Sequence, residues 1–135
     1  MKKVYAVILF LGVLFLDMAC EDSTVYFNDV ALINNSNDTI SVSWTWANKI
    51  ILTPELSFVQ KIFIVVPPND SVVVKNATPI NGLEGIVSLF MVFKKSTLDR
   101  YSESEIIEKN IYDTLFVYDH EQLKAMNFTI KYNVK

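Results

Sequence analysis

The sequence is poor in the residues on which most catalytic and metal sites depend. It has one cysteine, one histidine and three glycines among 135 residues. A single histidine cannot supply the several ligands that a zinc site requires, and one cysteine cannot form an internal disulfide. Three glycines, one of them in the N-terminal apolar run, are too few for a glycine-rich phosphate loop. We therefore expect no metal centre, no cofactor and no enzymatic activity.

The histidine and the acidic residues of the C-terminal part have ordinary structural explanations. His120 lies at the start of a predicted helix, where a solvent-facing or capping role is expected. The acidic residues fall at predicted helix starts and turns, where capping and solvation explain them better than a pair of glycosidase acids does. They are Asp99, Glu103, Glu105, Glu108, Asp113, Asp119 and Glu121. We predict no catalytic residue.

The chain also lacks an apolar run long enough to cross a membrane as a helix. The run from Val4 to Leu16 has 13 residues and is followed by Asp17, whereas a spanning helix needs about 20. Lys2 and Lys3 precede it. A cationic start, a short apolar middle and a small residue before the cut are typical of a secretory signal peptide. We predict that residues 1–19 form such a signal.

The only cysteine follows this run and narrows the type of signal. Ala19-Cys20 resembles the lipobox of bacterial lipoproteins, in which the cysteine receives a diacylglyceryl group and becomes the acylated N-terminus. Asp17 stands where that motif usually has an apolar residue, a departure that lipoproteins of the Bacteroidota tolerate. The resemblance implies a lipid on Cys20, and several acyl chains anchor a protein firmly. A cysteine without a role in a discarded or retained leader is the alternative.

The two acidic residues after Cys20 indicate on which side of the outer membrane the anchored protein is displayed. Glu21-Asp22 resembles the acidic export tag that carries some Bacteroidota lipoproteins to the cell surface. We expect an outer-membrane lipoprotein, with surface display favoured over the periplasmic leaflet. Residues 20–28 are then the lipidated N-terminus and tether. Residues 29–135 are predicted to form a single domain.

The mature chain is acidic. Removing the leader, with Lys2, Lys3 and Asp17, leaves 116 residues that carry 10 basic and 14 acidic side chains, a net charge of about −4. Nucleic acid is a poor partner for this balance, because its binding requires a basic patch that neutralises phosphates. The apolar and aromatic content indicates a folded domain rather than a disordered stalk.

Residues 39–46, TISVSWTW, show the clearest strand pattern. Apolar and hydroxyl side chains alternate there with a period of two, which is typical of a strand buried on one face. The apolar positions are Ile40, Val42, Trp44 and Trp46. Residues 30–33 lead into a turn-forming cluster at residues 34–38, so we predict a β-hairpin that joins the two strands.

Further strands are predicted downstream. Residues 61–66 and 71–74 are β-branched runs on either side of a Pro-Pro-Asn-Asp turn. Residues 86–93 are apolar nearly throughout, which is typical of a central strand covered on both faces. Residues 111–118 and 128–132 return to the strand pattern.

Two short helices interrupt these strands. Ser102 and Glu105 have the spacing of a capping box, which opens a helix through about Lys109. Asp119 is placed to cap a second helix that ends near Asn127. We predict a mainly β fold, namely an antiparallel β-sandwich of immunoglobulin-like or related type with two short helices in the C-terminal third.

Trp44 and Trp46 allow two interpretations. Two tryptophans on one strand face could form a flat platform for sugar rings. They share that face with Ile40 and Val42, however, and large aromatic side chains pack cores more often than they line grooves. We therefore predict that both are buried, and ligand binding by Trp44 and Trp46 is the alternative.

The segment from Phe93 to Tyr132 carries a series of short features. A hydrophobic strand, a Thr-Leu step, a helix, a strand ending in an aromatic residue, a helix with a leucine and an Asn-aromatic pair follow one another. The positions are Thr97-Leu98, Ile106, Tyr118, Leu123 and Asn127-Phe128. This series and the leader resemble small Bacteroidota lipoproteins of unknown function. The resemblance implies no catalytic residues, because that family has no established activity.

Four triplets resemble the O-glycosylation motif of exported Bacteroidota proteins, in which Asp precedes Ser or Thr and then an apolar residue or Thr. Asp before Ser or Thr is also ordinary chemistry for a turn that leads into a strand, so both interpretations stay open. The acceptor residues would be Ser23, Thr39, Ser71 and Thr114.

Together these features predict a lipid-anchored envelope lipoprotein with a structural or interaction role and no catalysis. Its expected partners are the membrane, through the N-terminal lipid, and an envelope protein or a glycan. The main alternative is a carbohydrate-binding accessory protein of a glycan-uptake system. That alternative requires the two tryptophans at the surface.

Overall fold

The computed structural model describes residues 25–49, 64–80 and 85–133, which form seven strands in two sheets and three short helices. One sheet has the order β4-β1-β7, with β4 at Ser71–Pro79, β1 at Phe27–Asn34 and β7 at Thr129–Tyr132. The other has the order β3-β2-β5-β6, with β3 at Ile64–Val66, β2 at Ile40–Asn48, β5 at Ile86–Lys94 and β6 at Thr114–Tyr118. The helices are α2 at Lys95–Arg100, α3 at Glu103–Glu108 and α4 at His120–Ala125.

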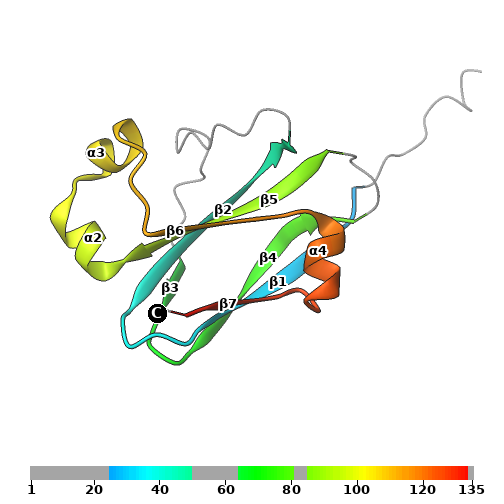
Figure 1. The fold of residues 1–135 in the computed structure, drawn as a ribbon, viewed down its shortest axis with the longest axis horizontal. Helices are drawn as coiled ribbons and strands as arrows, with labels where there is room; N and C mark the ends of the chain where they lie inside the picture. Colours follow the sequence, from blue (N-terminus) through cyan, green and yellow to red (C-terminus); the bar gives the residue numbers. More distant parts are fainter. Residues whose placement is uncertain (1–24, 50–63, 81–84, 134–135) are drawn as a thin grey trace, which may run out of the picture.

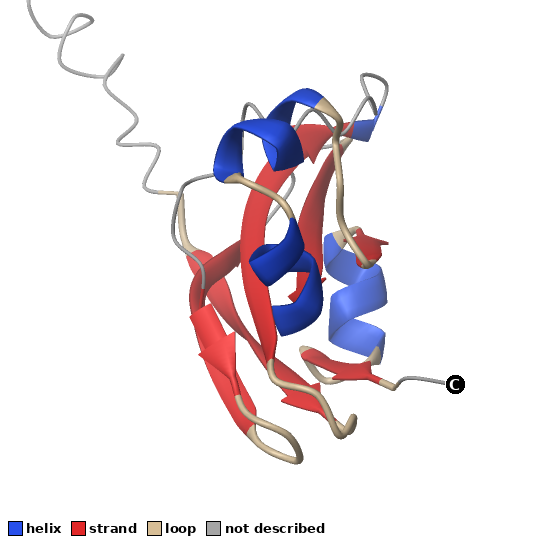
Figure 2. Cartoon of the chain, turned by 90° about the vertical axis from the view of Figure 1, so that its left-hand side faces the viewer, coloured by secondary structure: helices blue, strands red, loops and turns tan. Residues whose placement is uncertain are grey.

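This arrangement confirms the predicted mainly β class and its mostly antiparallel pairing. The four-stranded sheet is antiparallel throughout, whereas β7 pairs in parallel with β1. Figure 1 shows α2 and α3 at one end of the molecule and α4 near the other. Viewed from the first end, α2 and α3 lie in front of the strands (Figure 2).

The main core lies between the two sheets, because both present their apolar positions inward. Leu32 of β1, Val42 of β2 and Phe90 of β5 are fully buried there. Leu123 of α4 is buried in the same cluster. The other buried members are Val30, Ile40, Val66, Val74, Ala77, Val92, Ile130 and Tyr132.

Strand β5 is buried on both faces, as its continuous apolar sequence predicted. Phe90 and Val92 point into the core between the sheets, while Met91 and Phe93 belong to a second cluster on the opposite face. Ile106 of α3 is the buried helical member of that cluster. Leu98, Tyr101, Ile111, Tyr112 and Leu115 pack against it.

The predicted β-hairpin between β1 and β2 is wrong. The two strands are consecutive, but β1 pairs with β4 and β7, and β2 pairs with β3 and β5. The segment between them crosses from one sheet to the other. This crossing lets the apolar faces of β1 and β2 oppose each other across the core instead of lining a single sheet face.

The structure has a third helix that was not predicted. Helix α2 begins after Lys94, whose side chain makes no capping hydrogen bond, so the usual start signal is missing. Leu98 of this helix packs against the second cluster. Packing of this partly buried leucine against the cluster that contains Met91 and Phe93 of β5, and not local capping, explains the helix.

The two predicted helix caps are confirmed. Ser102 and Glu105 form a capping box at the start of α3, with the Ser102 oxygen accepting from the Glu105 N–H. Asp119 and Gln122 form the equivalent box at the start of α4. Both helices are only six residues long, so these caps satisfy a large share of their free N–H groups.

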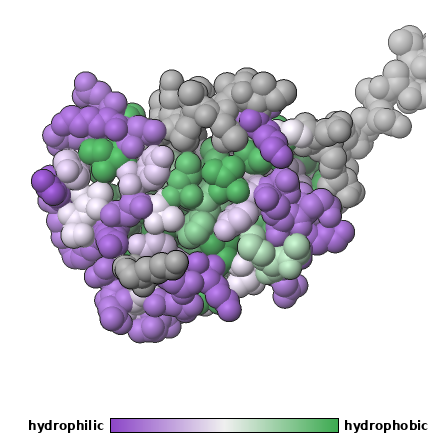
Figure 3. Space-filling view, viewed as in Figure 1, coloured by the Kyte–Doolittle hydropathy of each residue, from purple (hydrophilic) through white to green (hydrophobic). Residues whose placement is uncertain are grey.

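On the side of the sandwich formed by β6 and β7, large apolar side chains of the main core are only partly covered. Phe116 and Tyr118 of β6 stack with ring centroids 6.1 Å apart and pack against the main core, yet both are half-buried. Figure 3 shows apolar surface at the centre of this side, with hydrophilic residues around it.

The buried position of Phe90 predicts its effect on stability. Phe90→Ala removes a ring that is 0% exposed, and we expect a loss of about 3–5 kcal/mol in the free energy of unfolding. Val73→Ala is the control, because Val73 is 50% exposed and surface changes usually stay within about 0.5 kcal/mol. Urea unfolding of the two variants measures the difference. Equal midpoints would contradict the proposed core.

Candidate binding site

The pairing of β1 with β4 contains an irregularity that shapes the site. Val30 of β1 pairs with Val74 of β4, and Asn28 pairs with Thr78. These two pairs are two residues apart along β1 but four residues apart along β4. The two extra residues of β4 form a β-bulge opposite Asp29. Bulges re-aim side chains and are common beside functional sites.

Asp29 holds this bulge in place with both carboxylate oxygens. Its Oδ1 accepts a hydrogen bond from the Asn76 N–H at 3.0 Å, and its Oδ2 accepts one from Lys75 Nζ at 2.6 Å. Asn76 has a φ of 52°, in the left-handed region that asparagine tolerates better than most residues. The hydrogen bond from Lys75, followed by that from the Asn76 backbone, lowers the pKa of Asp29.

Trp46 lies across from this bulge, near the end of β2. Its Nε1 donates a hydrogen bond to the Ala77 carbonyl of β4 at 3.1 Å. Its ring stacks on Phe27 of β1, with centroids 4.8 Å apart and an interplanar angle of 17°. Two contacts with the opposite sheet thus fix the indole, although 44% of the residue remains exposed.

The prediction that both tryptophans are buried is wrong for Trp46. Trp44, two residues earlier on the same strand face, is half-buried and packs against the main core. Trp46 is nearer the end of β2, where fewer residues of the strand are buried. Its inward face is covered by Phe27 and Ala77, and its remaining surface is open.

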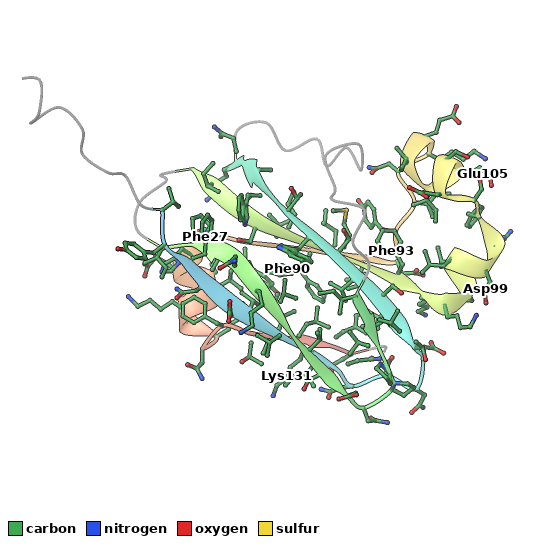
Figure 4. The ribbon with its side chains drawn as sticks, turned by 180° about the vertical axis from the view of Figure 1, so that it is seen from behind. Phe27, Phe90, Phe93, Asp99, Glu105 and Lys131 are labelled. Atoms are coloured by element: carbon green, nitrogen blue, oxygen red, sulfur yellow. The ribbon has the colours of Figure 1, made fainter. Side chains whose placement is uncertain are left out.

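A pocket of about 250 Å³ lies between β2 and β4. Its lining residues are Trp44, Thr45, Trp46, Lys75 and Asn76. Figure 4 shows this side of the molecule, with Phe27 at the start of β1 and Phe90 between the sheets. The pocket combines an aromatic ring, an ammonium group and a carboxamide. It is smaller than the usual site for a drug-sized ligand and suits one small ring.

Of the other predicted site residues, the three that the structure describes, Thr39, Ser71 and Thr114, do not line this pocket. Cys20 and Ser23 are outside the described residues. Ser71 is exposed at the start of β4, where its N–H donates to its neighbour Asp70 at 2.7 Å. Thr39 and Thr114 are half-buried. Glycosylation of these hydroxyls stays a prediction.

At least four of the seven acidic residues of the C-terminal part make capping, ion-pair or hydrogen-bond contacts within the described structure. Glu105 and Asp119 act in the two capping boxes. Asp99 pairs with Lys95 at 2.6 Å, and Asp113 accepts the Lys94 N–H at 2.7 Å. Among the residues the structure describes, no three His, Cys, Asp or Glu side chains gather as metal ligands.

His120 is neither the cap of α4 nor fully solvent-facing. Asp119 provides the cap, and the half-buried imidazole packs against Phe128 with ring centroids 5.6 Å apart. Its Nδ1 is buried without a hydrogen-bond partner in the described part of the chain. This packing corrects the solvent-facing prediction.

Four residues that build the site were not predicted from the sequence. Phe27 was assigned to the tether, and Asp29, Lys75 and Asn76 were given no role. One signal was present, since Lys75 and Asn76 are two consecutive polar residues directly after the three valines of β4. That Asp29 contacts these two residues could not be predicted without knowing the register of β1 and β4.

No protein-family model, curated protein or solved structure matches the chain. None of the helices in the described ranges is both long and apolar enough to pass through a bilayer.

The lowered pKa of Asp29 predicts how acid affects the bulge. Because the folded protein favours the charged carboxylate, Asp29 contributes stability that is present above about pH 4 and is lost as the pH falls through the lowered pKa. We expect Asp29→Asn to unfold at lower urea than the wild type at neutral pH. The two midpoints should converge in strong acid.

Urea titrations from neutral pH to about pH 2 test this expectation. Asp99→Asn is the matched control, because it removes the same charge and a similarly exposed lysine pair, but one that lies within helix α2 and not at the bulge. A midpoint difference for Asp29→Asn that stays constant with pH would show that the carboxylate charge does not hold the bulge.

Proposed function

We propose that this protein is a lipid-anchored binding component of a bacterial outer membrane, without catalysis, and that its ligand site is the Trp46 pocket. The proposal combines the lipobox-like Ala19-Cys20 with the geometry around Trp46. The observation that carries it is that two contacts fix the Trp46 indole while 44% of the residue is exposed.

A fixed and exposed aromatic ring favours binding over a purely structural role. Exposing so much of a tryptophan sacrifices burial of apolar surface that would stabilise the fold. The hydrogen bond to Ala77 and the stacking on Phe27 restrict the ring before any ligand arrives. Restricting a contact group in advance lowers the entropic cost of binding.

The polar side of the pocket supports the same conclusion. Lys75 and Asn76 of the bulge line the pocket, and Asp29 bonds the Lys75 ammonium and the Asn76 backbone N–H. The pocket thus has a rigid aromatic wall and positioned polar groups, which is the usual composition of a small-molecule site.

The anchoring part of the proposal predicts the effect of Cys20→Ser. The variant lacks the sulfur that would carry the lipid, so it should be found in the soluble fraction or as an uncut precursor. Fractionation and mass spectrometry of the N-terminal peptide measure the outcome. Ser71→Ala is the control and should remain in the membrane fraction. Wild-type protein that is soluble and carries no acyl group would refute the anchor.

The binding part predicts that an envelope extract protects the tryptophans from acrylamide quenching. Asn76→Gly should weaken this protection, because it removes the carboxamide while glycine keeps the left-handed backbone. Asn69→Gly is the matched control, since Asn69 is exposed with a φ of 56° in the turn before β4. A folded wild-type protein whose quenching the extract leaves unchanged would refute the binding site.

A further inference from the structure

We propose that the Trp46 pocket binds one neutral sugar ring, stacked on the indole and hydrogen-bonded by Asn76 and by the Lys75–Asp29 pair. This inference rests on the proposed function and names the class of ligand. The sequence pattern suggested sugar binding by the two tryptophans alone, and the inference adds the polar residues of the pocket.

The aromatic wall fits the face of a pyranose ring. A pyranose presents C–H groups on its flat faces and hydroxyls around its edge, so it can place an apolar face on an indole while its rim stays polar. Trp46 offers such a surface, because stacking on Phe27 and bonding to Ala77 hold its plane. The exposed part of the indole borders the pocket.

The polar groups match hydroxyls, which both donate and accept hydrogen bonds. The Asn76 carboxamide has donors and an acceptor, and no hydrogen bond of that side chain occurs within the described residues. Lys75 Nζ is a donor with three hydrogens, of which Asp29 engages one at 2.6 Å. The Asp29 carboxylate is a nearby acceptor.

The charge balance at the pocket selects a neutral ring. The Lys75 ammonium is already compensated by the Asp29 carboxylate at 2.6 Å. A phosphate, sulfate or uronic acid would have to approach that carboxylate and compete with it for the ammonium. The like-charge repulsion opposes an anionic ligand, whereas a neutral ring leaves the pair intact.

The length of the tether places the pocket near the membrane. Phe27, which stacks on Trp46, is seven residues after Cys20, so the chain between them spans at most about 25 Å along any path. Tyr26 and Val25, directly before β1, are 64% and 46% exposed. Sugar headgroups of the same leaflet and free glycans are therefore both within reach of the pocket.

Acrylamide quenching of the full-length protein tests the ligand class, with the protein kept in a zwitterionic detergent that has no sugar headgroup. The probes are methyl glycosides of common neutral hexoses, each compared with the uronic acid of the same ring. At least one neutral glycoside should protect the tryptophans saturably. Its uronic acid should bind at least tenfold more weakly.

Two variants test the residues. Trp46→Ala should abolish the heat of binding of that glycoside in calorimetry, which needs no tryptophan signal. Asn76→Gly should weaken binding by about tenfold, the usual effect of losing one good hydrogen bond, and its backbone is compatible with the fold. Asn69→Gly should bind as the wild type does. Urea midpoints identify any variant that has lost its fold.

A vesicle assay distinguishes the two sources of the sugar. Vesicles with and without a monohexosyl diacylglycerol are offered to the lipidated protein and to Cys20→Ser. Protection that needs the vesicle sugar and Cys20 supports a headgroup ligand, while equal protection of both proteins by the free glycoside supports a soluble glycan. Both results support a sugar ring.

Three results would overturn the inference. They are no protection by any neutral glycoside, tighter binding of the uronic acid, and equal binding by Asn76→Gly and Asn69→Gly. If the envelope extract still protects the wild type while no glycoside does, the binding function stands and the ligand class is wrong. If neither protects, the proposed function itself is wrong.

Discussion

The fold depends on the burial of strand β5 on both of its faces. One face carries Phe90 and Val92 into the core between the sheets, and the other carries Met91 and Phe93 under the helices. A strand with this composition is stable only where both faces are covered. The three-stranded sheet supplies one cover, and the α2–α3 segment supplies part of the other.

Two polar contacts between the sheets lie at different ends of the sandwich. Asn34 of β1 is fully buried, and its Nδ2 donates to the Val66 and Pro67 carbonyls at 3.1 and 2.9 Å. The Trp46 Nε1 joins β2 to Ala77 of β4 at 3.1 Å. Asn34 is closed off from solvent, whereas Trp46 is partly open to it and lines the pocket.

Local and periodic features were predictable from the sequence, and pairings between distant segments were not. The apolar run of β5 and the caps at Ser102 and Asp119 depend on neighbouring residues, and they were predicted correctly. Helix α2 has no side-chain cap, and the partners of β1 are about 40 to 100 residues away in the sequence, so no local pattern specifies them.

For the same reason, only part of the candidate site could be predicted from the sequence. Trp46 was visible in the sequence, but Asp29 and the bulge exist only in the β1–β4 register.

The parallel pairing of β7 with β1 has a consequence for how the chain reaches its folded state. Residues 31–34 of β1 pair with residues 129–132 of β7, so the three-stranded sheet cannot close until almost the whole sequence is present. Contacts between such distant segments form slowly. If the chain is exported N-terminus first, as we propose, β1 would leave the translocation channel well before β7 and would have to wait for it. Of the described strands, β7 is then the one whose arrival completes the three-stranded sheet.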